Sequence, residues 1–234
     1  MLIMKLTEFV KNELAGWKRH EFVGLVVVAV IIMINSVLLK DNIVAVISAF
    51  CGILYTAIAG KGKVSCYIFG LCGSGCYSWL AFQNALWGNL ILYLCYYIPS
   101  QICGFFSWNR HLKKESHEII KRELGLKEKN LLIAVCIIGS VITSIILFCL
   151  KDSNPIVDGI TTFLSIAGMY LTVKRCIEQW IIWFIVNTLS FAMWLNIIIG
   201  GERVYSTLVM WAVYIILAVY FYKEWKKELI NLKE

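Results

Sequence analysis

The stretch Glu178-Gln179-Trp180-Ile181-Ile182-Trp183-Phe184-Ile185-Val186-Asn187 opens one of the long apolar segments of this sequence. Its two tryptophans and its asparagine occupy positions i, i+3 and i+7, so on an α-helix they share one face. The asparagine would then lie near the middle of a bilayer, where an unpaired amide is costly. The pattern predicts that this face lines a small-molecule site.

Similar apolar segments recur along the whole chain. The 234 residues are 60% hydrophobic, with a mean hydropathy of +0.76 and only two prolines. Several segments reach the roughly 17 to 25 residues that cross a bilayer as a helix. The sequence therefore predicts an all-α polytopic membrane protein with eight transmembrane helices, at Phe22–Leu39, Ile43–Gly60, Val64–Phe82, Leu86–Trp108, Leu131–Leu150, Ile156–Val173, Gln179–Ile199 and Val204–Tyr222.

The basic residues predict the orientation of these helices. If the N-terminus is cytoplasmic, the outer connections hold only Lys40, Lys151 and Arg203 of the 22 lysines and arginines, and the inner segments hold the other 19. Such a bias is typical of multi-pass proteins, whose cytoplasmic loops are rich in lysine and arginine. We expect both termini to be cytoplasmic. The long connection around His111–Lys129 has scattered apolar residues and is predicted to form a short amphipathic helix at the membrane surface.

Other classes of protein fit poorly. The net charge of +7 has no RNA-binding signature or phosphate loop beside it, so no nucleic-acid partner is expected. The first apolar segment is too long for a signal peptide. The nine cysteines form no CxxC pair and lie mostly in apolar segments, which argues against disulfides or a metal site. No cofactor is expected, nor is an enzyme, because no acid pair, histidine or Ser/His arrangement lies within a predicted span.

An internal repeat is the next feature. With an offset of 113, six of the nineteen positions of 43–61 meet identical residues: Ile43, Val44, Ile47, Phe50, Ile53 and Lys61 match Ile156, Val157, Ile160, Phe163, Ile166 and Lys174. Both units start from the same side, so the repeat is parallel. The predicted parts are an N-terminal segment with a leading helix (1–40), a first three-helix bundle (41–110), a linker with a linking helix (111–150), and a second three-helix bundle with a tail (151–234).

This 3+1+3 layout, with Glu178-x-Trp180-x-x-Trp183-x-x-x-Asn187 after the linking helix, resembles the PnuC-type vitamin transporters. The segment Gly104-Phe105-Phe106-Ser107-Trp108 adds to the resemblance, and the layout is that of the SWEET sugar transporters. The resemblance implies uptake of nicotinamide riboside across the bacterial inner membrane by facilitated diffusion, trapping by a cytoplasmic kinase, and a homotrimer. Thiamine or another nucleoside-like vitamin is the alternative substrate.

The same resemblance gives the candidate binding residues: Trp180, Trp183 and Asn187 by motif, and Gln83, Asn84 and Gln101 by weaker alignment. The offset of 113 places Tyr214 opposite Gln101 and small residues opposite the Trp183 face, which favours a pocket with one aromatic wall. Indole faces attract a cationic aromatic ring, and amides can bind a carboxamide or ribose hydroxyls. Thiamine is also cationic and aromatic, so this reasoning leaves both vitamins open.

Two further expectations concern mechanism. No charged residue falls in the middle of a predicted span, so an uncoupled uniporter is the simplest mechanism, although a Na⁺ site built from carbonyls and hydroxyls stays open. Pro99 interrupts the fourth predicted helix one turn from Gln101 and predicts a bend there. Trp180 could instead be an interfacial anchor, and Asn187 could bind a neighbouring helix. A receptor or scaffold that does not transport is the alternative of a different class.

Overall fold

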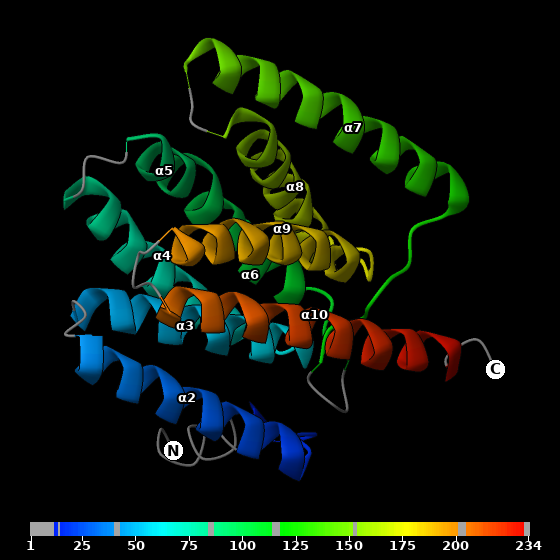
Figure 1. Cartoon of the computed structure of the whole chain (residues 1–234). Coiled ribbons are helices and arrows are strands. Elements are labelled where there is room, and N and C mark those ends of the chain that lie inside the picture. Colours follow the sequence, from blue (N-terminus) through cyan, green and yellow to red (C-terminus); the bar gives the residue numbers. More distant parts are fainter. Residues whose placement is uncertain are drawn as a thin grey trace. The chain divides into compact units, whose positions relative to one another are not determined.

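The structure is a computed structural model of the whole chain that describes residues 12–13, 15–39, 43–83, 87–113, 118–151, 154–200 and 205–231. These residues are almost entirely helical (Figure 1). The helices are α2 (Arg19–Leu39), α3 (Ile43–Gly60), α4 (Cys66–Gln83), α5 (Trp87–Leu92), the π-helical turn η1 (Tyr93–Tyr97), α6 (Ile98–Asn109), α7 (Leu126–Cys149), α8 (Pro155–Val173), α9 (Gln179–Ile199) and α10 (Tyr205–Asn231).

Each predicted apolar segment overlaps this helical structure, and two of them, Ile43–Gly60 and Gln179–Ile199, coincide with α3 and α9. Within the described part of the chain, five helical stretches are long and apolar enough to cross a membrane: Ile43–Gly60, Leu90–Asn109, Leu126–Cys149, Pro155–Val173 and Leu208–Asn231. Many of their large apolar side chains are exposed, on α7 above all, as expected of helices that face lipid. The all-α class predicted from hydropathy is confirmed.

The chain forms two compact units, Met1–Ile120 and Lys121–Glu234. In the first unit, α4 packs against both α3 and α6. Small residues allow the close approach: a Cβ at Gly73 would lie 3.1 Å from the Cβ of Cys51, and the Ser48 hydroxyl donates to the Gly73 carbonyl (3.1 Å). On the other side of α4, Tyr67 lies against Gly104 and contacts Trp108 edge-on, with 5.1 Å between ring centroids. Small residues at helix contacts are usual in membranes, because there packing replaces the hydrophobic effect.

The predicted interruption near Pro99 is present. The π-helical turn Tyr93–Tyr97 separates α5 from α6, and Pro99 follows it in the first turn of α6. Because proline has no N–H and its ring crowds the preceding turn, the helix widens there. The wider turn changes the direction in which the side chains of α6, including Gln101, point relative to those of α5.

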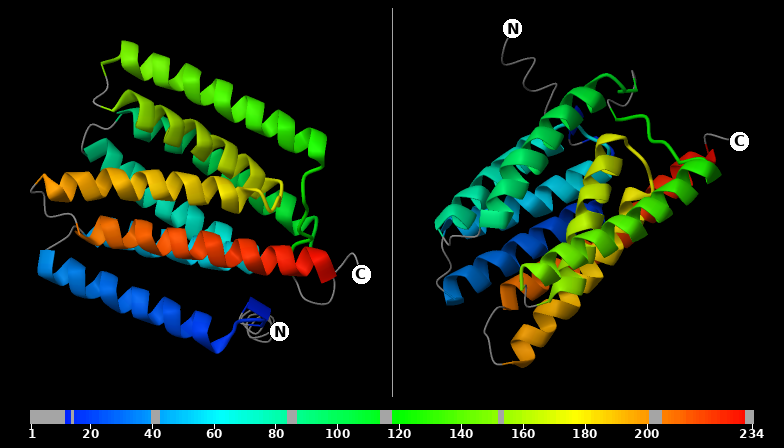
Figure 2. Two further views of the ribbon diagram at one scale, coloured as in Figure 1. Left: turned by 45° about the vertical axis from the view of Figure 1, so that its right-hand side comes forward. Right: turned by 90° about the horizontal axis from the view of Figure 1, so that it is seen from above.

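In the second unit the helices pack in chain order, α7 on α8, α8 on α9 and α9 on α10, which the two views of Figure 2 also show. The contact of α7 with α8 is very close, because a Cβ at Gly159 would lie 2.6 Å from the backbone of Ser144. The apolar core of this unit comprises Cys136, Leu164, Ala167, Leu171, Cys176, Ile182 and Val186, with Trp183 packed against it. This core holds α8 and α9 in a defined register.

The turns that join α3 to α4 and α8 to α9 have the same backbone geometry. Gly62 has φ +69° and Arg175, which stands at the equivalent position for an offset of 113, has φ +60°. The hydrogen bonds also correspond. Lys63 N–H donates to the Ile58 carbonyl (3.2 Å), and Cys176 N–H donates to the Leu171 carbonyl (3.0 Å). The same type of turn therefore joins α3 to α4 in the first unit and α8 to α9 in the second.

The segment before α7 differs from the prediction. Residues 111–113 and 118–125 are not helical, so the predicted amphipathic helix His111–Lys129 is wrong over the described residues, and helix begins only at Leu126. Ile119 is fully buried, and its N–H donates to the Gly62 carbonyl (2.9 Å) within the first unit. In the second unit, Arg122 N–H donates to the Arg175 carbonyl (3.0 Å). An extended backbone has free N–H groups that can bond to these turn carbonyls. In a helix the same N–H groups would already be bonded within the helix.

Candidate functional site

The face of α9 predicted as a binding surface divides into side chains with different surroundings. Trp183 is half-buried, and its indole N–H donates to the hydroxyl of Thr172 on α8 (3.3 Å). Asn187, one turn further along α9, is only 6% exposed. No hydrogen bond joins its side-chain amide to another described residue. The amide is therefore a group that a ligand could bind.

Trp180 belongs to the protein core. It is 3% exposed and contacts Phe221 and Trp225 of α10, at centroid distances of 5.4 Å and 5.6 Å. In the first unit, the equivalent positions are Tyr67 and Trp108, which also pair ring to ring. Both units thus hold their second and third helices together with a buried aromatic pair, so Trp180 has a packing role, which the sequence did not distinguish from ligand contact or interfacial anchoring.

Gln101 is the candidate binding residue of the first unit that is buried. It is 5% exposed on α6, and its Nε2 donates to the hydroxyl of Ser74 on α4 (2.9 Å). Its Oε1 is buried without a hydrogen-bond partner among the described atoms. A Cβ at Gly70 would lie 3.1 Å from that oxygen, so only glycine leaves space there. An unsatisfied buried carbonyl oxygen is the acceptor that an amide or hydroxyl of a ligand could use.

The other three predicted binding residues show no unpaired buried polar group in the described structure. Gln83 ends α4 and is exposed, and Asn84 lies outside the described residues. Tyr214 is half-buried on α10, with its ring 5.9 Å from that of Trp211. It occupies the position equivalent to Gln101, as Asn187 does to Ser74. The amide–hydroxyl hydrogen bond of the first unit has no counterpart at the second pair within the described structure.

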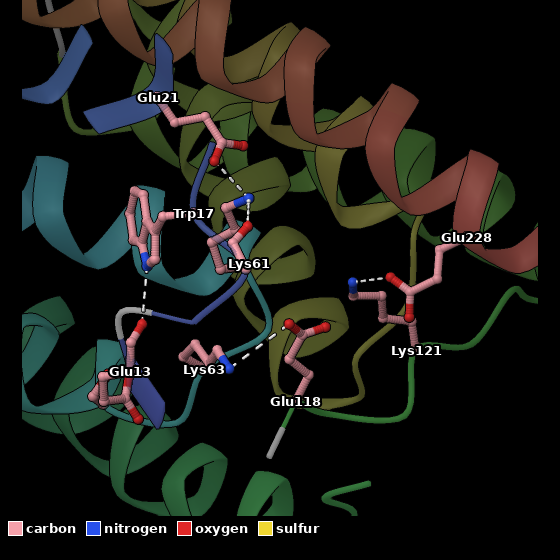
Figure 3. Close-up of polar contacts among 10 residues, drawn as sticks. Glu13, Trp17, Glu21, Lys61, Lys63, Glu118, Lys121 and Glu228 are labelled. Carbon is pink, nitrogen blue, oxygen red and sulfur yellow. Dashed lines mark hydrogen bonds and ion pairs between the residues drawn. The ribbon is translucent and has the colours of Figure 1, made fainter. Parts of the chain in front are cut away.

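Ion pairs hold the α3–α4 turn within the first unit (Figure 3). Lys61 Nζ lies 2.6 Å from Glu21 Oε2 and donates to the Gly16 carbonyl (2.9 Å), and Lys63 is fully buried 3.7 Å from Glu118. Buried ammonium groups need such partners. These lysines, predicted only as topology signals, therefore also tie neighbouring segments to the turn.

A second network belongs to the start of α9. Glu178, the first residue of the motif, accepts from the Leu124 N–H through Oε1 (3.1 Å), and the same oxygen lies 3.3 Å from Lys129 Nζ. Lys121 pairs with Glu228 (Figure 3). The Lys121 ammonium also lies 5.2 Å from the ring centroid of Trp225. These contacts attach the segment before α7 to α9 and α10. Glu178 thus has a structural partner in its own unit.

One titratable group in the turn between α8 and α9 is perturbed. Burial raises the pKa of the Cys176 thiol to about 11, since the thiolate would be poorly solvated. This thiol is not part of the Trp183–Asn187 face. In the part of the chain that the structure describes, no three His, Cys, Asp or Glu residues are grouped to hold a metal ion.

Sequence reasoning missed Thr172, which holds the indole of Trp183. Threonine in a membrane helix usually bonds to its own helix, and Thr172 also donates to the Gly168 carbonyl (2.9 Å), so its type alone gives no signal. The internal repeat does give a signal, because the position equivalent to Thr172 in the first unit is Ala59. The hydroxyl is thus an addition specific to the second unit.

Comparison with known proteins is consistent with this architecture. The sequence model of the family described as "nicotinamide mononucleotide transporter" matches residues 42–227. The nicotinamide riboside transporter PnuC of Neisseria mucosa is 31% identical over 230 residues, covering 96% of this chain and 88% of that protein. The transporter of the same name from Haemophilus influenzae is 30% identical, covering 96% and 97%. The crystal structure of the vitamin B3 transporter PnuC superposes with a TM-score of 0.80 at 32% identity, covering 93% of this chain and 95% of that one.

Proposed function

Because this chain belongs to the nicotinamide mononucleotide transporter family, in which its matched relatives are PnuC transporters, we propose that it carries nicotinamide riboside across the bacterial inner membrane. The observation that carries the proposal is the buried Asn187 amide, without a partner in the described structure, one turn from the half-buried Trp183 indole. Nicotinamide riboside offers the complementary groups: a carboxamide for the amide and a cationic ring for the indole.

The first unit supports the same substrate class. The free Oε1 of Gln101 accepts a hydrogen bond from a carboxamide or a ribose hydroxyl, and Gly70 leaves the space beside it. A ligand that cannot donate leaves this buried oxygen unsatisfied and binds more weakly. Buried amides of this kind favour a polar, planar vitamin over an apolar one or a simple ion.

Transport proceeds by facilitated diffusion with alternating access. The motif face holds no charged side chain, and the lysines of the first unit's turn are bound in ion pairs within that unit. A proton-coupled carrier needs an acid or histidine within the membrane. Phosphorylation in the cytoplasm then retains the substrate and maintains its inward gradient. In this topology both termini are cytoplasmic, and the transporter assembles as a homotrimer.

The matching turns at Gly62 and Arg175, and the aromatic pairs Tyr67–Trp108 and Trp180–Phe221, support a parallel repeat of two three-helix bundles. The leading helix α2 precedes the first bundle, and α7 links it to the second. Rocking of two similar bundles is an established route to alternating access in such transporters.

Proteoliposomes test the function directly. Purified protein should equilibrate labelled nicotinamide riboside until the inner and outer concentrations are equal, and an enclosed kinase with ATP should raise the internal label above that level. Accumulation driven by an imposed proton or sodium gradient would contradict facilitated diffusion. Flux of thiamine alone would change the substrate, and binding without flux would favour a receptor.

Asn187→Leu is the informative variant in the same vesicles. It keeps the branched shape of the side chain and removes the amide. It should weaken nicotinamide riboside binding by about 1 to 3 kcal/mol and lower the flux accordingly. Thr188→Val is the matched control, because the Thr188 hydroxyl is exposed and donates only to the Phe184 carbonyl of its own helix (2.8 Å). Equal loss in both variants would show that α9 tolerates no change and would not support a ligand at Asn187.

A further inference from the structure

We infer that Thr172 and Gly168 of α8 are positioning residues for the substrate-binding indole of Trp183. The inference deepens the proposed function and rests on it. The hydroxyl of Thr172 accepts a hydrogen bond from the indole N–H of Trp183 (3.3 Å) and donates one to the Gly168 carbonyl (2.9 Å). The three residues form a short chain of hydrogen bonds from the backbone of α8 to the ring.

The hydroxyl is well placed to restrict the ring. Thr172 is 2% exposed, so water does not compete for the indole N–H at this site. A β-branched side chain in a helix has few rotamers, and its hydroxyl position is correspondingly defined. A hydrogen bond in a buried environment is stronger than the same bond in water. The polar edge of the indole is therefore held toward α8.

Gly168 provides the space that this orientation needs. A Cβ there would lie 3.0 Å from Cε2 and 3.2 Å from Cζ2 of Trp183, and 3.2 Å from Cγ2 of Ile182. The two ring carbons belong to the same edge as the N–H. Glycine thus lets this edge lie against α8, and alanine would push the ring away by a few tenths of an ångström.

The consequence concerns how Trp183 can recognise a substrate. Its only hydrogen-bond donor is occupied by Thr172, so the indole offers the ligand its aromatic surface. An attraction between a π face and a cationic ring depends on ring orientation. A ring that α8 already orients loses less entropy when the ligand binds. Thr172 and Gly168 therefore act on affinity through Trp183, without contacting the ligand themselves.

The first unit shows that this anchor is not required for packing alone. At the equivalent contact, the aromatic ring comes from the other helix: Tyr55 of α3 lies against Gly70 of α4, with a Cβ there 2.8 Å from the ring. The position equivalent to Thr172 is Ala59, which has no hydroxyl. Each unit thus packs one aromatic ring against one glycine at this contact. In the second unit a threonine hydroxyl of the neighbouring helix also binds the ring, whereas the equivalent residue of the first unit, Ala59, has no hydroxyl.

The test compares two readouts in the full-length protein. Thr172→Val removes the hydroxyl and keeps the shape, and Thr172→Ser restores the hydroxyl. Thr161→Val on the same helix is the control, because the Thr161 hydroxyl donates only to carbonyls of α8. The indole ¹⁵N–¹H resonance of Trp183, identified by its loss in Trp183→Phe, reports the hydrogen bond without ligand. Calorimetric titration with nicotinamide riboside reports affinity.

Thr172→Val should shift the Trp183 resonance and weaken binding of nicotinamide riboside by about two- to tenfold. Thr172→Ser should restore both values, and Thr161→Val should change neither. If valine prevents folding, Thr172→Ala removes the same hydroxyl. A shifted resonance with wild-type affinity would overturn the positioning role and leave the proposed function standing. Wild-type protein that binds no nicotinamide riboside would overturn the proposed function, and a shift in the Thr172→Val resonance would then show a packing role only.

Discussion

Gly62 and Arg175 occupy equivalent places in the two units, and both have a left-handed backbone, with φ of +69° and +60°. Each carbonyl accepts a hydrogen bond from a neighbouring extended segment, from Ile119 in the first unit and from Arg122 in the second. The left-handed residue turns its carbonyl outward after the last turn of the helix, as at many helix ends. Glycine adopts this conformation without strain, whereas arginine does so at a cost.

This relationship gives a stability prediction. Gly62→Ala places a Cβ on a left-handed residue and should lower the free energy of unfolding by about 1 to 2 kcal/mol. Thermal unfolding in detergent measures the change. Gly75→Ala in α4 is the control, because a Cβ there meets nothing within 4 Å and alanine favours helix. An unchanged melting temperature for Gly62→Ala would mean that the turn relaxes without strain.

Trp180 and Trp183 should respond to truncation in different ways. Trp180→Ala removes a buried ring that contacts Phe221 and Trp225, and should cost about 3 to 5 kcal/mol of stability. Trp183→Ala should lower stability less and weaken nicotinamide riboside binding by about 0.5 to 2 kcal/mol or more. Unfolding and calorimetric titration of both variants separate the two effects. The reverse pattern would assign the ligand contact to Trp180.

Gln101→Leu should separate binding from stability. The leucine removes both the unsatisfied Oε1 of Gln101 and the Nε2 hydrogen bond to Ser74, two opposing effects, so stability should change little. Nicotinamide riboside binding should weaken by about 1 to 3 kcal/mol. Thr56→Val is the control, since the Thr56 hydroxyl donates to the Gly52 carbonyl of its own helix (3.0 Å). Full affinity in Gln101→Leu would remove this residue from the site.

Cys176 should resist alkylation. Its buried thiol has a pKa of about 11, so the reactive thiolate is scarce near pH 8 and its fraction rises about tenfold per pH unit up to that value. Mass spectrometry after treatment with a maleimide should find Cys149, which is exposed at the end of α7, modified before Cys176. Denaturation should abolish the difference. Rapid labelling of Cys176 in folded protein at pH 8 would show that the α8–α9 turn opens readily.

The sequence alone was sufficient for the helices and the family. Hydropathy and helix length are local properties, so the extent of α3 and α9 could be read directly from apolar segments. The motif of α9 predicted the family, which the comparisons confirm. The offset of 113 identified positions whose backbone and aromatic contacts correspond in the structure, at Gly62 and Arg175 and at Tyr67 and Trp180.

Only the tertiary structure decided what each side chain of the motif does. Trp180 and Trp183 are alike in sequence, yet α10 buries the first and α8 binds the indole N–H of the second. The extended segment around Ile119 also has apolar residues that fit an amphipathic helix, but the carbonyl of Gly62 binds its backbone instead. Helical periodicity gives the face on which a residue lies, whereas its partners come from helices that are distant in the chain, and packing between them sets burial and hydrogen bonding.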